Sequence, residues 1–139
     1  MLLCVCLCSC AENSPSLEEM KIEESFSEYP NNFINWDEIL SQQSKIYFVY
    51  VFSYDCYYCR QIKNRIISFS NSSEYSVYFV EYSKQIPIKN NLSITIGAKD
   101  IDNVFIKGTP SLLLIDDATV AINVGGKNEV CEILQLYEN

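Results

Sequence analysis

One stretch, Lys45 to Phe69, constrains the fold of this chain more than any other part of it. It begins with the continuous apolar run Ile46–Phe52, whose length and β-branched and aromatic residues are typical of a strand buried on both faces. After a short polar break, Cys56 and Cys59 begin a segment in which apolar residues recur at steps of three and four. That spacing places them on one face of a helix. The sequence therefore predicts a buried strand, a tight turn, and a helix with two cysteines in its first turn.

The two cysteines are spaced for disulfide chemistry. Residues three apart in the first turn of a helix bring their sulfurs close enough to bond. The unpaired N–H groups and the helix dipole at that point favour a thiolate on Cys56, and a thiolate is the attacking species in disulfide exchange. Cys59 is one turn further in, where it can attack a mixed disulfide on Cys56 and release the partner.

This unit and a second segment together resemble the thioredoxin-like thiol-disulfide oxidoreductases. The second segment is Gly108–Ile115, followed by the apolar run Val120–Val124 and two glycines. In that family the proline of such a segment is cis and faces the C-x-x-C motif, while the residue before it offers its backbone to the substrate. The resemblance implies these roles for Pro110 and Thr109. It covers residues 33–139.

Three positions depart from the pattern of that family. Tyr57 and Tyr58 replace the Gly-Pro or Pro-His found between the cysteines, and we expect them to form an apolar, stacking lip for a peptide partner. Asp55 replaces a tryptophan, and its carboxylate would oppose thiolate formation if it lay close. The buried acid of the family falls on Tyr50. Glu81 or a water would therefore have to accept the proton of the second cysteine.

The remaining elements follow from local patterns. Strands are expected over residues 75–82, 111–115 and 119–124, and helices over 33–44, 99–104 and 128–137. Asn35 and Glu38 have the spacing of a capping box at the start of the first helix, and Leu136 is expected to face inward on the last. Cys131 is expected to be a small buried hydrophobe. The order βαβ then ββα predicts an α/β, thioredoxin-like fold with a central mixed sheet flanked by helices on both faces.

The composition limits the other chemistry of the chain. Its 139 residues carry a net charge of −8, which argues against a nucleic-acid partner, and they include no histidine. The cysteine pair lacks two further ligands for zinc within this chain, so we expect no metal and no cofactor beyond the dithiol itself. A purely structural disulfide is the alternative. The expected partners are protein or peptide thiols and disulfides and a redox partner protein, and the chain is expected to be a monomer.

The N-terminus differs in character from the rest. Residues 1–10 are apolar and uncharged and contain four of the seven cysteines. They are too short to span a bilayer and resemble the processing site of a bacterial lipoprotein, which implies that Cys10 is lipidated. A cysteine-rich disordered tail and C-x-C metal ligation are the alternatives. Residues 11–32 are acidic and predicted to be a flexible linker, which leaves residues 33–139 as the folded domain.

The expected function is thiol-disulfide exchange on protein substrates. If the lipoprotein resemblance holds, the domain is tethered to the membrane outside the cytoplasm of a bacterium. The alternatives are a cytoplasmic thioredoxin-like reductase and a non-catalytic accessory protein, for example for secretion of a peptide. The residues do not determine whether the dithiol acts as oxidant, reductant or isomerase, because that depends on its reduction potential.

Overall fold

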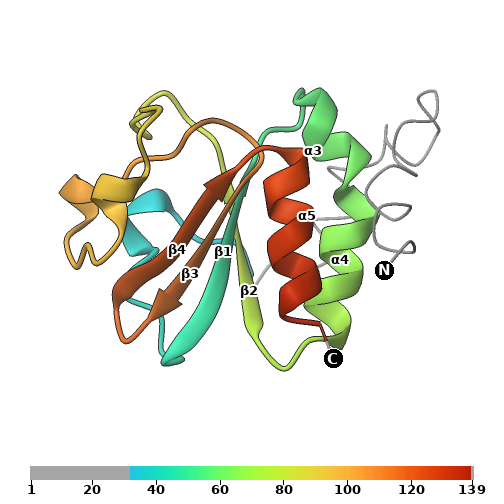
Figure 1. Ribbon diagram of the computed structural model, residues 1–139, viewed down its shortest axis with the longest axis horizontal. Helices are drawn as coiled ribbons and strands as arrows, with labels where there is room; N and C mark the ends of the chain where they lie inside the picture. Colours follow the sequence, from blue (N-terminus) through green and yellow to red (C-terminus); the bar gives the residue numbers. More distant parts are fainter. Residues whose placement is uncertain (1–31, 139) are drawn as a thin grey trace.

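The computed structural model describes residues 32–138, which are arranged around a four-stranded sheet (Figure 1). The strands are β1 (Ile46–Phe52), β2 (Ser76–Glu81), β3 (Ser111–Asp116) and β4 (Thr119–Gly125), in the spatial order β2-β1-β3-β4. Strand β1 pairs parallel with β2 and antiparallel with β3, and β3 forms an antiparallel hairpin with β4. The mixed sheet predicted from the order of the elements is confirmed.

Strand β1 is central because both of its faces are apolar. Every residue of it except Ile46 is buried. Alternate side chains point to opposite faces of a strand, so one strand supplies two cores. The cluster on one face contains Phe48, Tyr50 and Phe52, and the cluster on the other contains Tyr47, Val49 and Val51.

One face of the sheet is covered by α-helices, and we call it the helix face. The helices are α3 (Tyr57–Gln61), α4 (Lys63–Ser72) and α5 (Lys127–Leu136), which Figure 1 shows together on the same side. Ile62, between α3 and α4, departs from helical geometry with φ −104° and ψ 11°. The helix predicted after the two cysteines is present as α3 and α4 and ends at Ser72. Its apolar side chains, including Cys59, Ile62, Ile66 and Phe69, form the helix-face core with Val130, Cys131 and Leu134.

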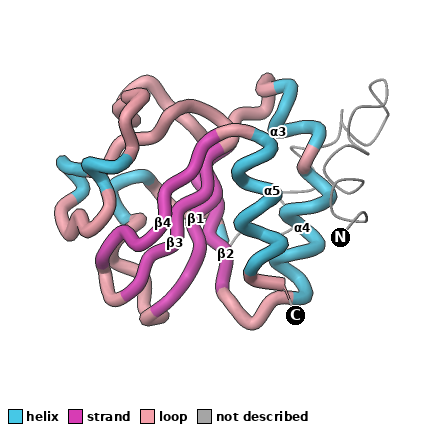
Figure 2. Tube along the Cα trace, in the orientation of Figure 1, coloured by secondary structure: helices cyan, strands magenta, loops and turns pink. Residues whose placement is uncertain are grey.

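The opposite face is covered by short turns and loops, and we call it the loop face (Figure 2). Its helices are three 3₁₀ turns, η4 (Trp36–Glu38), η5 (Ser93–Thr95) and η6 (Ile101–Asn103). Helices therefore flank both faces as predicted, but those on this face are single turns. The loop-face core is nevertheless fully buried, and the segments that cover the sheet contribute Ile39, Ile86, Val104 and Ile106.

The helix predicted over residues 33–44 is wrong in extent. Phe33 forms a parallel bridge with Phe79, and the Ile34 N–H donates to the Phe79 carbonyl at 3.0 Å, so the chain here is extended rather than helical. The proposed cap is partly present, because the Glu38 carboxylate accepts a hydrogen bond from the Asn35 N–H at 2.8 Å. The helix predicted over 99–104 is likewise reduced to η6.

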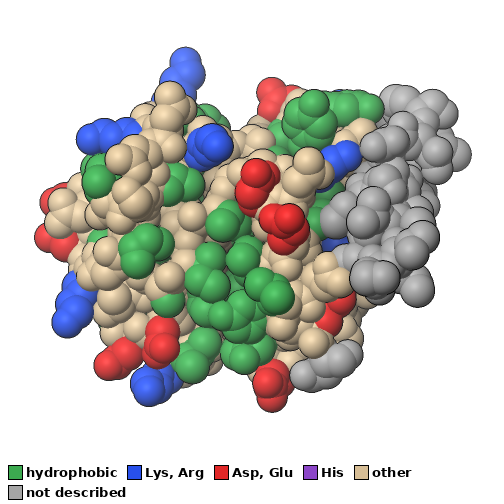
Figure 3. Space-filling view, viewed as in Figure 1, with side chains coloured by type: hydrophobic (Ala, Val, Ile, Leu, Met, Phe, Trp, Pro, Cys, Tyr) green, Lys and Arg blue, Asp and Glu red, His purple; other side chains and the backbone are tan. Residues whose placement is uncertain are grey.

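The inward position predicted for Leu136 is also wrong. Its side chain is 75% exposed, whereas Val130 and Leu134 are fully buried. At 100° per residue, Leu136 lies about 200° around the helix from Leu134, on the opposite side. Cys131 is buried as predicted. Figure 3 shows apolar side chains at the surface over β4 and α5, where this helix leaves the edge of the sheet partly uncovered.

The N-terminal predictions fall outside the described residues. They are the lipidation of Cys10, the signal-like segment 1–10, and the linker except for its last residue. Within residues 32–138, none of the helices has both the length and the apolar character that crossing a membrane requires.

Candidate active site

The two cysteines of the motif lie side by side where β1 gives way to α3. Cys56 is the N-cap residue of α3, with extended backbone angles (φ −80°, ψ 118°), and Cys59 is in the first turn. The Cys59 N–H donates a hydrogen bond to the Cys56 Sγ at 3.1 Å. Both thiols are free, and their sulfurs are near disulfide distance. The turn and the short helix thus place the two sulfurs as disulfide exchange requires.

The thiol of Cys56 is partly exposed and readily ionised. Its pKa is lowered to about 6, first by a hydrogen bond from the Cys59 thiol, although partial burial acts in the opposite direction. Further hydrogen bonds, from the Thr109 side chain and from the backbone N–H groups of Cys59 and Tyr58, lower the pKa as well. Cys56 is therefore mostly thiolate at neutral pH, which is the nucleophilic form.

The thiol of Cys59 has the opposite properties. Its side chain is completely buried, and this burial is the main reason why its pKa is raised. The hydrogen bond it donates to Cys56, and the negative charge of that thiolate, raise the pKa further. Cys59 therefore holds its proton while Cys56 is ionised. The two cysteines of one motif are electrostatically distinct, one a partly exposed thiol with a lowered pKa and the other a buried thiol with a raised pKa.

The turn that carries Thr109 and Pro110 lies against Cys56. The peptide bond between these two residues is cis, the geometry that the resemblance implied. When protonated, the Cys56 thiol donates a hydrogen bond to the Thr109 carbonyl, with an S–O distance of 3.5 Å. The Gly126 N–H donates to the Pro110 carbonyl at 2.8 Å and ties the turn to the start of α5. Segments 53 residues apart in the sequence thus meet at the Cys56 sulfur.

Two tyrosines next to Cys56 are open to solvent. Tyr57 and Tyr58 are 46% and 53% exposed, and their ring centroids are 5.4 Å apart in an edge-to-face arrangement. The ammonium group of Lys127 lies 5.9 Å from the Tyr58 ring centroid. Large exposed aromatic side chains of this kind are suited to contact a partner. Their role as a lip for a peptide partner stays a prediction.

The carboxylate of Asp55 was expected to oppose ionisation of its neighbour. It accepts a hydrogen bond from the Ser53 hydroxyl. Asp55 is not among the main influences on the pKa of Cys56, which hydrogen bonds to the sulfur lower and partial burial raises. The predicted opposition therefore does not decide the ionisation state of Cys56.

Sequence reasoning overlooked the hydroxyl of Tyr50. This side chain is completely buried in the helix-face core, in the same cluster as Cys59. The prediction treated position 50 only as the place of a missing acid. The alternation of Phe48, Tyr50 and Phe52 on the strand that leads to the cysteines was the available indication, because it places the tyrosine on the same face as the motif helix.

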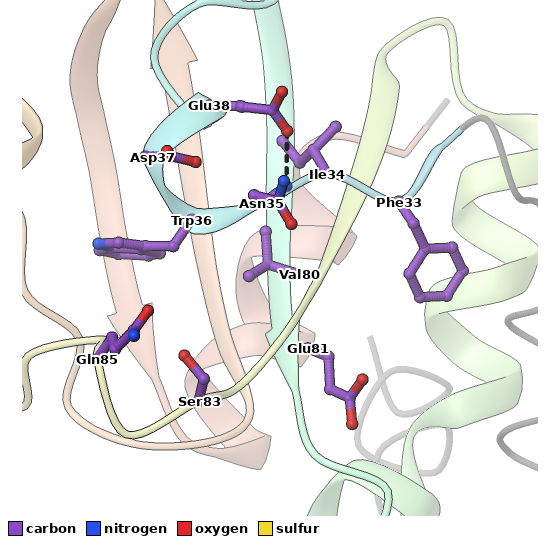
Figure 4. Close-up of a pocket in the computed structure, with 10 residues that line it drawn as sticks. All are labelled: Phe33, Ile34, Asn35, Trp36, Asp37, Glu38, Val80, Glu81, Ser83 and Gln85. Carbon is purple, nitrogen blue, oxygen red and sulfur yellow. Dashed lines mark hydrogen bonds between the residues drawn. The ribbon is translucent and has the colours of Figure 1, made fainter.

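Glu81, the suggested proton acceptor, lies elsewhere. Its exposed side chain lines a cavity of about 570 Å³ at the β2 edge of the sheet (Figure 4). The cavity is also lined by Trp36, Asp37 and Glu38, and no cysteine contributes to it. In Figure 4 the Phe33 ring and the Trp36 indole point in opposite directions, because this segment crosses the edge of the sheet and packs on both faces. The cavity is thus separate from the dithiol.

Comparison with known proteins identifies the fold. No family model and no curated protein sequence matches the chain. Thioredoxin f2 from Chlamydomonas reinhardtii superimposes with a TM-score of 0.50 at 12% sequence identity, over 75% of this chain and 93% of that one. A mutant thioredoxin from Halobacterium salinarum NRC-1 gives a TM-score of 0.47 at 13% identity, over 79% of this chain and 94% of that one. The thioredoxin-like α/β fold predicted from the sequence is confirmed.

Proposed function

We propose that this protein exchanges disulfides with protein or peptide substrates through the Cys56–Cys59 dithiol. The observation that supports this most directly is the difference between the two thiols. Cys56 is partly exposed with a pKa of about 6, and Cys59 is buried with a raised pKa. A structural cysteine pair has no need of an ionised, accessible sulfur, whereas disulfide exchange does.

The reaction proceeds in two balanced steps. The Cys56 thiolate attacks a substrate disulfide, forming a mixed disulfide while the other substrate sulfur leaves with the electron pair as a thiolate. Cys59 then loses its proton to the surrounding buffer and attacks the Cys56 sulfur. The second substrate thiolate leaves, and the Cys56–Cys59 disulfide forms. The substrate is reduced by two electrons and the dithiol is oxidised, and the reverse sequence oxidises a substrate without any cofactor.

The surface around Cys56 is suited to an extended peptide. Thr109 and Pro110 lie beside the sulfur, and the backbone of Thr109 is within hydrogen-bonding distance of it. Tyr57 and Tyr58, between the two cysteines, offer exposed ring surface. We assign all four residues to substrate binding, with the turn aligning the backbone and the tyrosines contacting side chains.

The test of this function is reduction of insulin disulfides by the full chain. Cys56→Ala is expected to abolish the catalysed rate, while Cys131→Ala serves as the matched control, because it removes a buried thiol and leaves the motif intact. Alkylation of Cys56 by iodoacetamide should follow its thiolate, falling to half of its plateau rate at about pH 6 and lower still in more acidic solution. Equal insulin reduction by the wild type and Cys56→Ala would refute the function and favour a non-catalytic, accessory role.

The location of the protein is a separate part of the proposal, and it is supported by the sequence alone. The segment before Cys10 resembles a lipoprotein processing site, which would place the domain outside the cytoplasm on a lipid anchor. Incorporation of labelled palmitate in a bacterial host should be lost in Cys10→Ala and kept in Cys8→Ala. Labelling that is absent from the wild type would remove the tether and favour the cytoplasmic alternative.

A further inference from the structure

The last residue of β4 is a buried glycine, Gly125, which lies against the turn that carries Thr109 and Pro110. It pairs with Ser111, the residue that follows this turn, at the end of the antiparallel hairpin. Figure 1 shows β4 ending at the same end of the sheet as β1, which leads into α3. Gly125 is therefore close in the fold to the segment that contacts the Cys56 sulfur.

Position 125 has no room for a side chain. A Cβ atom added to Gly125 would lie 2.8 Å from the Lys107 Cβ and 3.4 Å from the Ser111 hydroxyl oxygen. Carbon atoms that are not bonded pack at about 3.5–4.0 Å, so a methyl group here would push the chain at residue 107 away from β4. The obstructing atom is the first of the Lys107 side chain, which cannot move unless the backbone moves with it. A side chain at position 125 must therefore displace the segment that leads into the turn.

The turn is fastened to the end of β4 by hydrogen bonds on both sides of Thr109. The Ser111 hydroxyl donates to the Gly108 carbonyl, within the turn. The Gly126 N–H donates to the Pro110 carbonyl at 2.8 Å. Because the turn is short and held in this way, a movement at residue 107 is passed on to Thr109.

We propose that Gly125 is a positioning residue of the dithiol, because its missing side chain lets residues 107–110 pack against β4 and so places the Thr109 carbonyl at the Cys56 sulfur. These two atoms are 3.5 Å apart. The inference rests on the proposed function, since it concerns the turn that aligns the substrate with Cys56.

The test introduces the smallest side chain, Gly125→Ala, into the full chain. Insulin reduction is expected to slow about tenfold, because a small displacement of a group that aligns the substrate has a large effect on the rate. The pH at which iodoacetamide modifies Cys56 at half its plateau rate should rise by about 0.5 unit, since hydrogen bonding to Thr109 helps to keep the pKa of Cys56 low. An unchanged rate and pH profile would refute the role.

A second substitution checks the contact directly. Lys107→Gly removes the atom that the new methyl group would meet. Adding Gly125→Ala to Lys107→Gly should therefore change neither the rate nor the pH profile, each compared with Lys107→Gly alone. Equal effects of Gly125→Ala with and without the Lys107 side chain would overturn the proposal. If Gly125→Ala fails to fold, the double variant decides: a fold and pH profile like those of Lys107→Gly support the proposal, and failure to fold overturns it.

A matched control lies near the other end of β4. The Gly97 N–H donates to the Val120 carbonyl at 2.8 Å, and Val120 is about 17 Å along the strand from Gly125. With a φ of +87°, Gly97 also disfavours a side chain, but a Cβ there would meet no atom within 4 Å. Gly97→Ala should therefore lower stability and leave the rate and pH profile unchanged. Equal changes in Gly97→Ala and Gly125→Ala would overturn the proposal, because the effect would then be a general loss of stability.

The failure of this inference can be told from the failure of the proposed function. Alkylation of Cys56 by iodoacetamide does not require the protein to reduce insulin. If the wild type fails to reduce insulin, the proposed function is wrong, but the pH profiles of alkylation still report on Gly125. If the wild type reduces insulin and Gly125→Ala behaves like it in both measurements, only the role of Gly125 is wrong.

Discussion

The two faces of the sheet are closed by different means, although β1 supplies large side chains to both. On the helix face, three α-helices cover a core that contains Phe48 and Tyr50. On the loop face, 3₁₀ turns and irregular segments cover an equally buried core around Val49 and Val51. Complete burial therefore does not depend on regular helices. The difference lies in the polar groups that each covering layer brings to the sheet.

Two tyrosines on β1 show this difference most clearly. Tyr47 and Tyr50 are both buried, three residues apart on opposite faces. The Tyr47 hydroxyl bonds to a backbone carbonyl, that of Ile39, which can neither ionise nor react. The Tyr50 side chain lies in the core that also contains Cys59 and Cys131. The same kind of side chain on the same strand thus has a backbone partner on one face and cysteine neighbours on the other.

The largest loss of stability is expected from shortening a buried side chain of the loop-face core. Ile39→Ala removes a completely buried side chain and should lower the free energy of unfolding by about 2–5 kcal/mol. Ile66→Ala, at an equally buried position on α4, is the matched substitution on the helix face and should cost a similar amount. Urea unfolding of the two variants measures both costs.

The same pair of variants separates stability from chemistry. The pH at which iodoacetamide modifies Cys56 at half its plateau rate should stay at about 6 in Ile39→Ala, since the groups that lower this pKa all lie near the motif and the Thr109 turn. A loss of less than about 1 kcal/mol of unfolding free energy in Ile39→Ala would contradict the view that the two faces are equally well packed. The loop-face residues would then be packed too loosely to act as a core.

The helix face was predictable because its elements repeat at fixed intervals. Ile62, Ile66 and Phe69 recur with helical spacing, and the helix they indicated is present. The loop face has no such period. Its covering segments contribute one buried residue at a time, such as Ile86 and Val104, and each is held by its own backbone bonds. Pattern reasoning therefore extended the 33–44 segment into a helix that the bridge to β2 prevents.

The residues of the candidate site also differ in how far they could be predicted from the sequence. The cysteines and the Thr109–Pro110 pair are local motifs, so their positions could be predicted without coordinates. The surroundings of Tyr50 could not be, because they bring the middle of a strand and a buried cysteine of the following helix into one core. The sequence showed that a tyrosine replaces the acid of the family that the chain resembles. Only the packing shows that this tyrosine is completely buried in the same core as Cys59.

A smaller effect is expected from the polar group that ties the loop face together. The side-chain amide of Asn123 on β4 donates to the Thr95 hydroxyl at 3.0 Å and to the Phe105 carbonyl at 2.7 Å. Asn123→Ala leaves both acceptors without this donor and should cost about 1–3 kcal/mol in urea unfolding. Asn123→Asp, which keeps the size but replaces the amide donor with a carboxylate, should cost at least as much. A loss of stability near zero in both variants would contradict the expected difference between the two faces. The irregular segments of the loop face would then not depend on this side-chain hydrogen bonding.

The smallest effect is expected from the corresponding tie on the helix face. Arg65 on α4 forms an ion pair with Glu138, just beyond α5, at 2.7 Å, and the glutamate is 38% exposed. The Arg65 side chain is only 10% exposed, but the glutamate is open to water and salt that screen the pair, so we expect it to contribute about 0–1 kcal/mol. Glu138→Gln should therefore destabilise by less than about 1 kcal/mol, and the difference should shrink further in high salt. Glu132→Gln makes the same change of charge on an exposed position of α5 and corrects for net charge. If Glu138→Gln destabilises the protein as much as Asn123→Ala does, polar side-chain interactions stabilise both faces equally. The two faces would then differ only in the backbone geometry of the segments that cover them.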